Sequence, residues 1–475
     1  MPPIPLPLVP TEPATKEFLG TIQGNILNPH GRDHGRLIFF RFTGAGRQLR
    51  SIFPAAVAAE LVTTAGQQWD AARRAERSLA AKMAENPSDE PEVYGTEPFF
   101  GVGFSRLGLE ACGYRRGEMP GRGDRTFNQS MRDTAAELGD PQLGGGPDWE
   151  PDYLNEIHGV WLVAHDDPAQ LPGLEARVTT FLHGHGATKI FSDDGLRWKD
   201  RAAPDRVREP FGFVDGISQP EFFKGPEFVA MSKWTAMPVE QVLMARGDGH
   251  DGGSFLVLRK LEQDVKGFRA FEKEVRSDRA WPNPSPYEPG AVLVGRGRDG
   301  TPLQGSAAPG QNDFAFDGDT TRCPFHAHIR KSNPRITGGP PPNPVSPNTA
   351  QDDQAQLIVR RSMVYDRDGK LPVRAEPNYP EGENIGVDGG VGLLFLAYMS
   401  SLHQFTSLQS WFSDPAIPRL ADPATNLGDP LLRPDAVARS WEWLGVKRTL
   451  ASCVRPRGGE YFYVPSVTWL MAQQP

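Results

Sequence analysis

One acid stands inside an otherwise apolar decapeptide. Residues 211–220 read FGFVDGISQP, so Asp215 has two Phe, a Val and an Ile around it. Asp-Gly is a common turn dipeptide, and a turn acid can simply face water. The other interpretation is an acid held in a dry place for a purpose, because an unpaired buried charge is otherwise costly to keep. A carboxylate held in this way can take up and return protons during a reaction.

Two histidines, His326 and His328, stand two residues apart in CPFHAHIRK. With no third His or Cys at ligand spacing, this pair does not build a tetrahedral zinc site. One neutral imidazole can instead be the single protein ligand of haem iron, with its other ring nitrogen bonded to an acceptor that fixes the tautomer. The alternative is an ordinary surface or hydrogen-bonded structural histidine.

Two adjacent arginines, Arg360 and Arg361, lie in the β-branched run LIVRRSMVY at residues 357–365. Neighbouring residues of a strand face opposite ways, so we expect one arginine to point to water and the other inward. The inward arginine either forms an ion pair across a sheet or lines a pocket as a fixed positive charge, since Arg stays protonated at any useful pH.

Composition excludes several classes of protein. The chain has 475 residues, 38% of them hydrophobic and 23% charged, which predicts a globular protein of two or three domains. A formal net charge of −8, with no long run of Lys or Arg, argues against nucleic acid and anionic membranes as partners. No window approaches the 18 or so uninterrupted apolar residues that a transmembrane helix needs.

The cysteines and the first residues bear on location. Cys112, Cys323 and Cys453 are few and far apart, which indicates a reducing compartment rather than a disulfide framework. The opening MPPIPLPLVPTEP has neither the basic region nor the long apolar region of a signal peptide. We therefore expect a cytoplasmic protein whose residues 1–20 form an extended tail.

Strand-like and helix-like patterns alternate along the chain in an order that repeats. Apolar runs rich in β-branched and aromatic residues predict strands at 36–42, 99–104, 160–165, 254–260, 357–365, 392–399 and 461–470. Amphipathic spacing predicts helices at 49–77, 171–186, 261–276 and 401–412. The repeated strand–helix order predicts a duplicated α+β unit with mainly antiparallel sheets, although a chance match of pattern remains open. The charged, proline-containing stretch near 200–210 predicts domains at 21–205 and 206–475.

The combination of motifs resembles the dye-decolourising (DyP-type) haem peroxidase family. The resemblance is carried by GFVDGISQP, then CPFHAHIRKSNPR, LIVRRSMVY, GLLFLAYM and finally RGGEYFYVPSVTWL. The opening IQGNILNPHGRDHGRLIFFRF is similar to the start of the longer members, and the resemblance spans roughly residues 20–470. It implies an α+β fold of two ferredoxin-like domains in a dimeric α+β barrel-like arrangement, with one haem b per chain held mainly by the second domain.

The resemblance also implies roles for individual residues. Asp215 corresponds to the distal acid and base, and His328, rather than His326, to the proximal iron ligand. Arg360 corresponds to the charge-stabilising arginine, although VRRSMVYD departs from the usual Gly-Ile-Pro-Tyr and leaves Arg361 as the alternative. Further correspondences make Arg335 a haem-propionate partner and Leu393 and Phe395 pocket-lining residues. The motifs do not identify the carboxylate that would orient His328.

The resemblance implies a peroxidase that reduces hydrogen peroxide and oxidises dyes, phenols and other aromatic donors. Trp411 is a candidate surface relay for electrons, with core packing as the alternative. Two other functions stay open from the sequence. One is haem binding for storage, transport or iron release without turnover, and the other is a haem-free interaction protein. The sequence indicates neither the physiological donor, nor a use of manganese, nor whether the chain is a monomer or a homo-oligomer.

Overall fold

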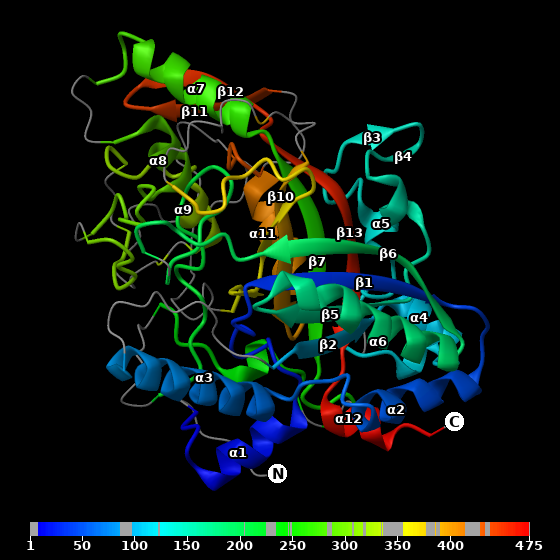
Figure 1. Ribbon diagram of the computed structural model, residues 1–475. Helices are drawn as coiled ribbons and strands as arrows, with labels where there is room; N and C mark the ends of the chain where they lie inside the picture. Colours follow the sequence, from blue (N-terminus) through cyan, green and yellow to red (C-terminus); the bar gives the residue numbers. More distant parts are fainter. Residues whose placement is uncertain are drawn as a thin grey trace.

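The computed structural model describes residues 8–85, 97–121, 124–203, 205–224, 234–245, 247, 249–282, 287–305, 308–316, 320–333, 335, 355–376, 385, 390–413, 428–432 and 438–474. Its main feature is one large antiparallel sheet that both halves of the chain build (Figure 1). The sheet has the order β7-β13-β2-β5-β1-β6-β9-β10-β8, and a further pairing of β7 with β10 closes it into a barrel.

The strands of this sheet are short to medium in length and largely buried. They are β1 (His34–Phe42), β2 (Phe99–Phe104), β5 (Gly159–His165), β6 (Ala187–Leu196), β7 (Ser254–Gln263), β8 (Val359–Arg360), β9 (Met363–Asp366), β10 (Val391–Met399) and β13 (Val454–Val464). Two small hairpins, β3 (Gln142–Leu143) with β4 (Gly146–Pro147) and β11 (Ala438–Trp443) with β12 (Val446–Ala451), stand apart from the barrel.

Helices connect and cover these strands. They are α1 (Pro13–Thr21), α2 (Ile52–Ala58), α3 (Ala65–Glu85), α4 (Arg106–Ala111), α5 (Met131–Thr134), α6 (Leu171–Gly184), α7 (Val265–Ser277), α8 (Pro289–Val294), α9 (His328–Ser332), α11 (His403–Ser413) and α12 (Val467–Ala472). Within the described ranges, no helix combines the length and the apolar character that crossing a bilayer requires.

The duplication predicted from the strand–helix order is confirmed by the topology. The first half pairs its strands in the order β6-β1-β5-β2, and the second half pairs its own in the order β13-β7-β10-β9. Counted along the chain, each half therefore has the ferredoxin-like order fourth, first, third, second. The halves join at two seams, where Leu196 is paired with Val364 and Phe104 with Tyr463. The boundary between residues 205 and 206 remains a prediction.

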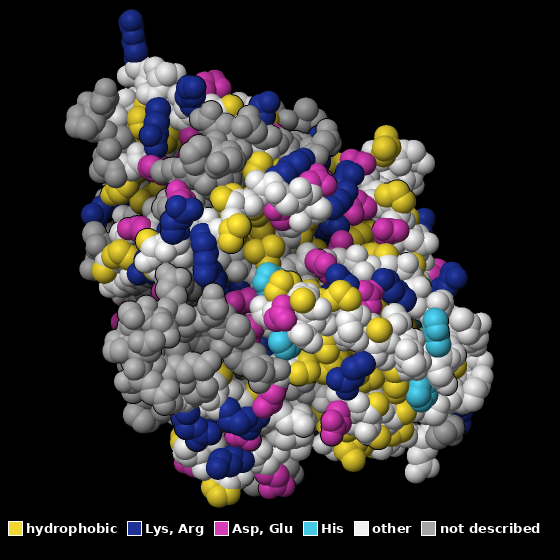
Figure 2. Space-filling view, in the orientation of Figure 1, with side chains coloured by type: hydrophobic (Ala, Val, Ile, Leu, Met, Phe, Trp, Pro, Cys, Tyr) yellow, Lys and Arg dark blue, Asp and Glu magenta, His cyan; other side chains and the backbone are white. Residues whose placement is uncertain are grey.

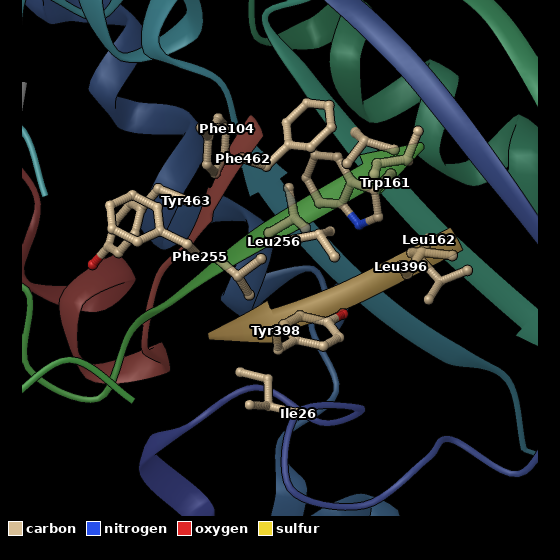
Figure 3. Close-up of a cluster of buried hydrophobic side chains, with 14 of the residues drawn as sticks. Ile26, Phe104, Trp161, Leu162, Phe255, Leu256, Leu396, Tyr398, Phe462 and Tyr463 are labelled. Carbon is tan, nitrogen blue, oxygen red and sulfur yellow. The ribbon is translucent and has the colours of Figure 1, made fainter. Parts of the chain in front are cut away.

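Aromatic residues are prominent in the core, which extends from the barrel strands to the helices that cover them, where Trp161 packs against Phe181 of α6 and Phe104 against Phe53 of α2. Figure 3 shows part of this core, with side chains of β2, β5, β7, β10 and β13 packed into one group that includes Phe104, Trp161 and Phe462. Trp161 is fully buried, and its indole N–H donates to the Leu61 carbonyl at 2.8 Å, so burial leaves that donor bonded. β-Branched and aromatic runs form the strands because they fit a pleated surface that is buried against neighbours.

A buried lysine ties the two halves together beside this core. Lys260 of β7 lies in the second half, and its Nζ bonds to Glu150 at 2.9 Å and to Asp193 of β6 at 2.7 Å. Both acids come from the first half of the chain. The pairs satisfy a charge that would otherwise be costly to bury.

The structure corrects three expectations about individual elements. The extended tail does not reach residue 20, because Pro13–Thr21 form α1, in which Pro13 takes the first helical position that proline tolerates. The helix expected at 49–77 is divided, since Glu60 has a left-handed φ of 53° and Thr64 with Gln67 caps the start of α3. The last predicted strand stops at Val464, because Pro465 cannot donate to a ladder and Ser466 caps α12.

The surface carries charges of both signs. On the face shown in Figure 2, Lys and Arg side chains are interspersed with Asp and Glu rather than gathered by sign.

Candidate active site

A cavity of about 1110 Å³ lies against one face of β7 and β10 in the second half of the chain. Arg259, Leu261 and Gln263 of β7 border it, as do Leu393 and Phe395 of β10, because alternate residues of a strand share a face. Loops and short helices of the second half supply most of the remaining lining. The six residues to which the family resemblance gives a place in the haem site all line this one cavity: Asp215, His328, Arg335, Arg360, Leu393 and Phe395.

Asp215 lies in a turn that borders the cavity, so its two interpretations do not exclude each other. Its Oδ1 accepts from the N–H of the next residue, Gly216, at 2.6 Å. Gly212 and Gly216 have φ values of 94° and 80°, which a residue with a side chain adopts only with strain. Asp215 is half-buried and contributes to the cavity lining.

His328 begins α9 and is held by a carboxylate that the sequence motifs did not identify. Its Nδ1 donates to Asp429 Oδ2 at 2.7 Å. Asp429 is fully buried, and its Oδ1 accepts from the Leu431 N–H at 2.8 Å. With the proton fixed on Nδ1, Nε2 is the ring nitrogen that carries the lone pair for a metal.

The neighbouring His326 is in a different place. It is buried, lies outside the cavity lining, and packs its ring edge-on against Trp441 with the ring centroids 5.6 Å apart. Burial lowers the pKa of His326 to about 3, so its ring is neutral. Of the two histidines, the structure places only His328 beside the cavity.

The side chains of Arg360 and Arg361 point to different parts of the molecule, and both contact other parts of the protein. Arg360 lines the cavity, where its Nη2 donates to the Ile217 carbonyl at 2.9 Å. Arg361 is buried and donates to the carbonyls of Asn25 and Ile26, both at 2.9 Å, in the first half of the chain. Burial lowers the pKa of Arg361 to about 9. Strand alternation predicted that one of the two arginines points to water. Arg361 instead connects the second half of the chain to the first.

A second arginine cluster borders the cavity near Ser218. Arg335 donates to Ser218 Oγ at 2.9 Å, and Arg296 donates to the same oxygen at 3.3 Å. Burial lowers the pKa of Arg335 to about 9 and that of Arg296 to about 10, and Arg296 adds to the fall at Arg335. In the part of the chain that the structure describes, the ion pairs include none from Arg296, Arg335 or Arg360. The cluster is therefore suited to an anionic group in the cavity.

Three features of this site were not expected from the motifs. They are the side chains of Asp429, Arg296 and Glu209, of which Arg296 and Glu209 line the cavity. The sequence around each of these residues contains no motif that would indicate a role in the site. Among the described residues, no group of three His, Cys, Asp or Glu side chains could hold a bare metal ion. The side chain of Trp411, the expected electron relay, lies outside the described residues.

Comparison with known proteins assigns the family. A sequence profile described as the DyP dimeric alpha+beta barrel domain matches residues 21–193. The multifunctional dye peroxidase DyP2 of Amycolatopsis sp. is 30% identical over 95% of both chains. The dye-decolorizing peroxidase msp1 of Mycetinis scorodonius is 28% identical over 77% of this chain and 74% of its own.

Solved structures agree with the sequence comparison. The DyP2 structure from Amycolatopsis sp. has a TM-score of 0.76 and 29% identity, over 97% of both chains. The DyP-type peroxidase of Anabaena sp. has a TM-score of 0.74 and 26% identity, over 98% of this chain and 97% of its own. These likenesses span both halves of the barrel and the cavity beside it. The chain therefore belongs to the DyP-type peroxidase family, whose members are oxidoreductases that act on peroxide.

Proposed function

We propose that this chain is a haem-dependent peroxidase that reduces hydrogen peroxide and oxidises dyes, phenols and other aromatic donors. The main observation that supports this function is that one cavity is lined by Asp215, Arg360 and His328. These residues lie in three separate segments of the chain, and only folding brings them together. Family membership and the naming of the relatives as dye peroxidases agree with this choice.

The residues around the cavity fit one haem b. One imidazole, His328, has its Nδ1 held by Asp429 and can offer Nε2 to iron. Apolar side chains that suit a porphyrin border the same space, among them Leu393 and Phe395. Arg335 can bond a carboxylate such as a haem propionate, since it lacks an ion pair within the described ranges. When bound, haem would supply the iron that takes up the oxidising equivalents of peroxide.

Asp215 and Arg360 have complementary tasks in this proposal. Asp215 Oδ1 already accepts the Gly216 N–H, so we assign proton transfer to Oδ2. That oxygen takes the proton from one peroxide oxygen and returns it to the other. As the O–O bond breaks, its electron pair goes to this second oxygen, which leaves as water, and the oxidising equivalents that remain are those that bound haem would take up. Arg360 stabilises the negative charge that develops on the leaving oxygen, because its guanidinium is held in advance by the Ile217 carbonyl. Asp429 keeps His328 in one tautomer and makes its ring more basic.

Haem binding without turnover, for storage, transport or iron release, would need His328 but not the other two groups. Asp215→Asn and Arg360→Leu separate the alternatives. We expect both variants to keep a Soret band of parental intensity and to lose peroxide-dependent oxidation of a phenol, roughly 100-fold or more. A parent protein that shows the Soret band but no peroxide-dependent oxidation would favour the binding protein, and parental rates in both variants would contradict the roles assigned to Asp215 and Arg360.

A further inference from the structure

The loop that carries Asp215 is held by an acid that no motif singles out. Glu209 Oε1 accepts from the Phe213 N–H at 2.9 Å, and Oε2 accepts from the Phe211 N–H at 2.9 Å. Oε2 also accepts from Gln263 Nε2 of β7 at 2.7 Å. One carboxylate therefore fastens the loop to itself and to the barrel.

The backbone of the loop depends heavily on this residue. Of the five amides from Phe211 to Asp215, two donate to the Glu209 carboxylate and a third, that of Gly212, donates to the Glu209 carbonyl at 2.8 Å. The remaining two donate to the Arg298 and Val207 carbonyls. Unpaired amides in such a place are costly, so loss of the carboxylate would leave the loop without its present shape.

Two buried arginines hold the other side of the same loop. Arg208 donates to the Gly212 carbonyl at 2.6 Å, and Arg298 donates to the Phe211 carbonyl at 3.4 Å. Within the loop, the guanidinium groups bond only carbonyls and the Glu209 carboxylate bonds only backbone amides. The two arginines and the Glu209 carboxylate therefore hold the loop from opposite sides, and the tight turn at Gly212 lies between these two sets of contacts.

Glu209 also lies within electrostatic reach of Asp215. Burial raises the pKa of Glu209, its three donors oppose that rise, and the negative charge of Asp215 adds to it. Both oxygens of Glu209 already accept hydrogen bonds, so a role in holding the loop suits it better than a role in carrying protons.

We propose that Glu209 is a positioning residue, whose carboxylate fixes the loop 209–216 and thereby sets where Asp215 lies in the cavity that it shares with Arg360. This role rests on the proposed function, in which Asp215 moves protons between the peroxide oxygens. Displacement of a catalytic group by about 1 Å can cost roughly 100-fold in rate, so a loosened loop should be visible in the kinetics.

The test compares Glu209→Gln with Glu460→Gln in the full-length holoenzyme. Glutamine has the size of glutamate but must turn one NH₂ group toward an N–H donor of the loop or of Gln263. Glu460 is the matched control, because its buried carboxylate also accepts two backbone amides, those of Met131 and Tyr461, and lies outside the cavity lining. The readouts are kcat/KM for hydrogen peroxide, KM for the donor, haem content, and hydrogen exchange of the loop amides.

We expect Glu209→Gln to lower kcat/KM for peroxide roughly 10- to 100-fold while haem content and KM for the donor stay parental. The Phe211 and Phe213 amides should exchange at least about tenfold faster. Glu460→Gln should change none of these quantities. A folded Glu209→Gln protein with parental peroxide kinetics, or with parental exchange of both amides, overturns the positioning role.

Two further measurements keep the outcome clear. If Glu209→Gln does not fold, hydrogen exchange in the parent protein is the test. The Phe211 and Phe213 amides must then be as protected as the amides of β7. Rapid exchange at either amide overturns the positioning role of Glu209. If Asp215→Asn retains parental peroxide kinetics, the acid–base part of the proposed function fails. The exchange data still judge whether Glu209 holds the loop, so the two failures are distinguishable.

Discussion

His328 Nδ1 donates to Asp429 Oδ2 at 2.7 Å, and Asp429 is fully buried beneath it. This pair joins two segments 101 residues apart and fixes which ring nitrogen of His328 can bind a metal. A histidine–carboxylate pair of this kind is what orients a metal-binding imidazole and raises its basicity.

Removal of the Asp429 charge should weaken haem binding. We expect Asp429→Asn to lower the affinity for haem about 10- to 100-fold, because the ring loses both its orienting partner and part of its basicity. Titration of haem into the haem-free protein measures this affinity. Asp166→Asn is the control, since Asp166 is a buried carboxylate of the first half that accepts the Asp33 N–H. Equal affinities in the two variants would contradict the role of Asp429.

Substitution of the two adjacent arginines should affect different properties of the protein. Arg361→Leu leaves the Asn25 and Ile26 carbonyls without their donor, so we expect the free energy of unfolding to fall by about 2–4 kcal/mol. Arg360→Leu removes a single side-chain bond to the Ile217 carbonyl and should affect peroxide kinetics far more than stability. Urea unfolding and peroxide kinetics on both variants test this. The opposite assignment of effects would make Arg361 the residue that acts on peroxide.

Turnover should persist in mildly acidic buffer. An aspartate side chain in water has a pKa of about 3.9 and a histidine about 6.5, so a carboxylate base remains ionised where an imidazole base is already protonated. We expect phenol oxidation at saturating peroxide to persist as the buffer is changed from neutral to mildly acidic pH, where an enzyme with an imidazole base would lose activity. An optimum well above neutrality would argue against Asp215 as the base.

Acid should also destabilise the fold through His30. Burial, with the positive charges of Arg197 and Arg32, lowers the pKa of His30 from 6.5 to about 3. Below pH 6.5 the unfolded chain takes up a proton that the folded chain does not. His30 therefore lowers the free energy of unfolding as the pH falls from 6.5 toward 3, by up to about 1.4 kcal/mol per pH unit.

His30→Gln should reduce the slope of stability against pH in that window. Urea unfolding at several pH values measures the slope. His403→Gln, at an exposed position of α11, serves as the control and should leave the parental slope. An unchanged slope in His30→Gln would show that the ring is not kept neutral by the fold.

Local chemistry explains which parts of the site could be predicted. Asp215, His328 and Arg360 each stand out against their neighbours, as an acid among Phe and Val, a histidine beside a basic run, and an arginine in a β-branched strand. Asp429 and Glu209 do not stand out. Asp429 acquires its role only when folding brings it to His328. Glu209 acquires its role by accepting hydrogen bonds from the backbone of a turn, and the spacing of residues in the sequence does not reveal the shape of that turn.

The same distinction holds for the fold. Strands such as β5 and β10 were predicted because they are apolar along their length. β6 was missed, since its sequence ATKIFSDDGL is half polar and its Asp193 is balanced by Lys260 from the other half. The duplicated strand order followed from the repeated pattern, but closure of both halves into one barrel depends on pairings across distant segments, which no local pattern encodes.

The most direct measurement is the visible absorption spectrum of the purified chain supplied with haem, compared with those of His328→Ala and His326→Ala. We expect the parent protein and His326→Ala to show a strong Soret band that changes on addition of hydrogen peroxide, and His328→Ala to lose this band or its response. A parent protein that stays colourless with haem present, or a His328→Ala variant that binds haem and responds to peroxide as the parent does, would contradict the assignment of His328 as the ligand of the iron.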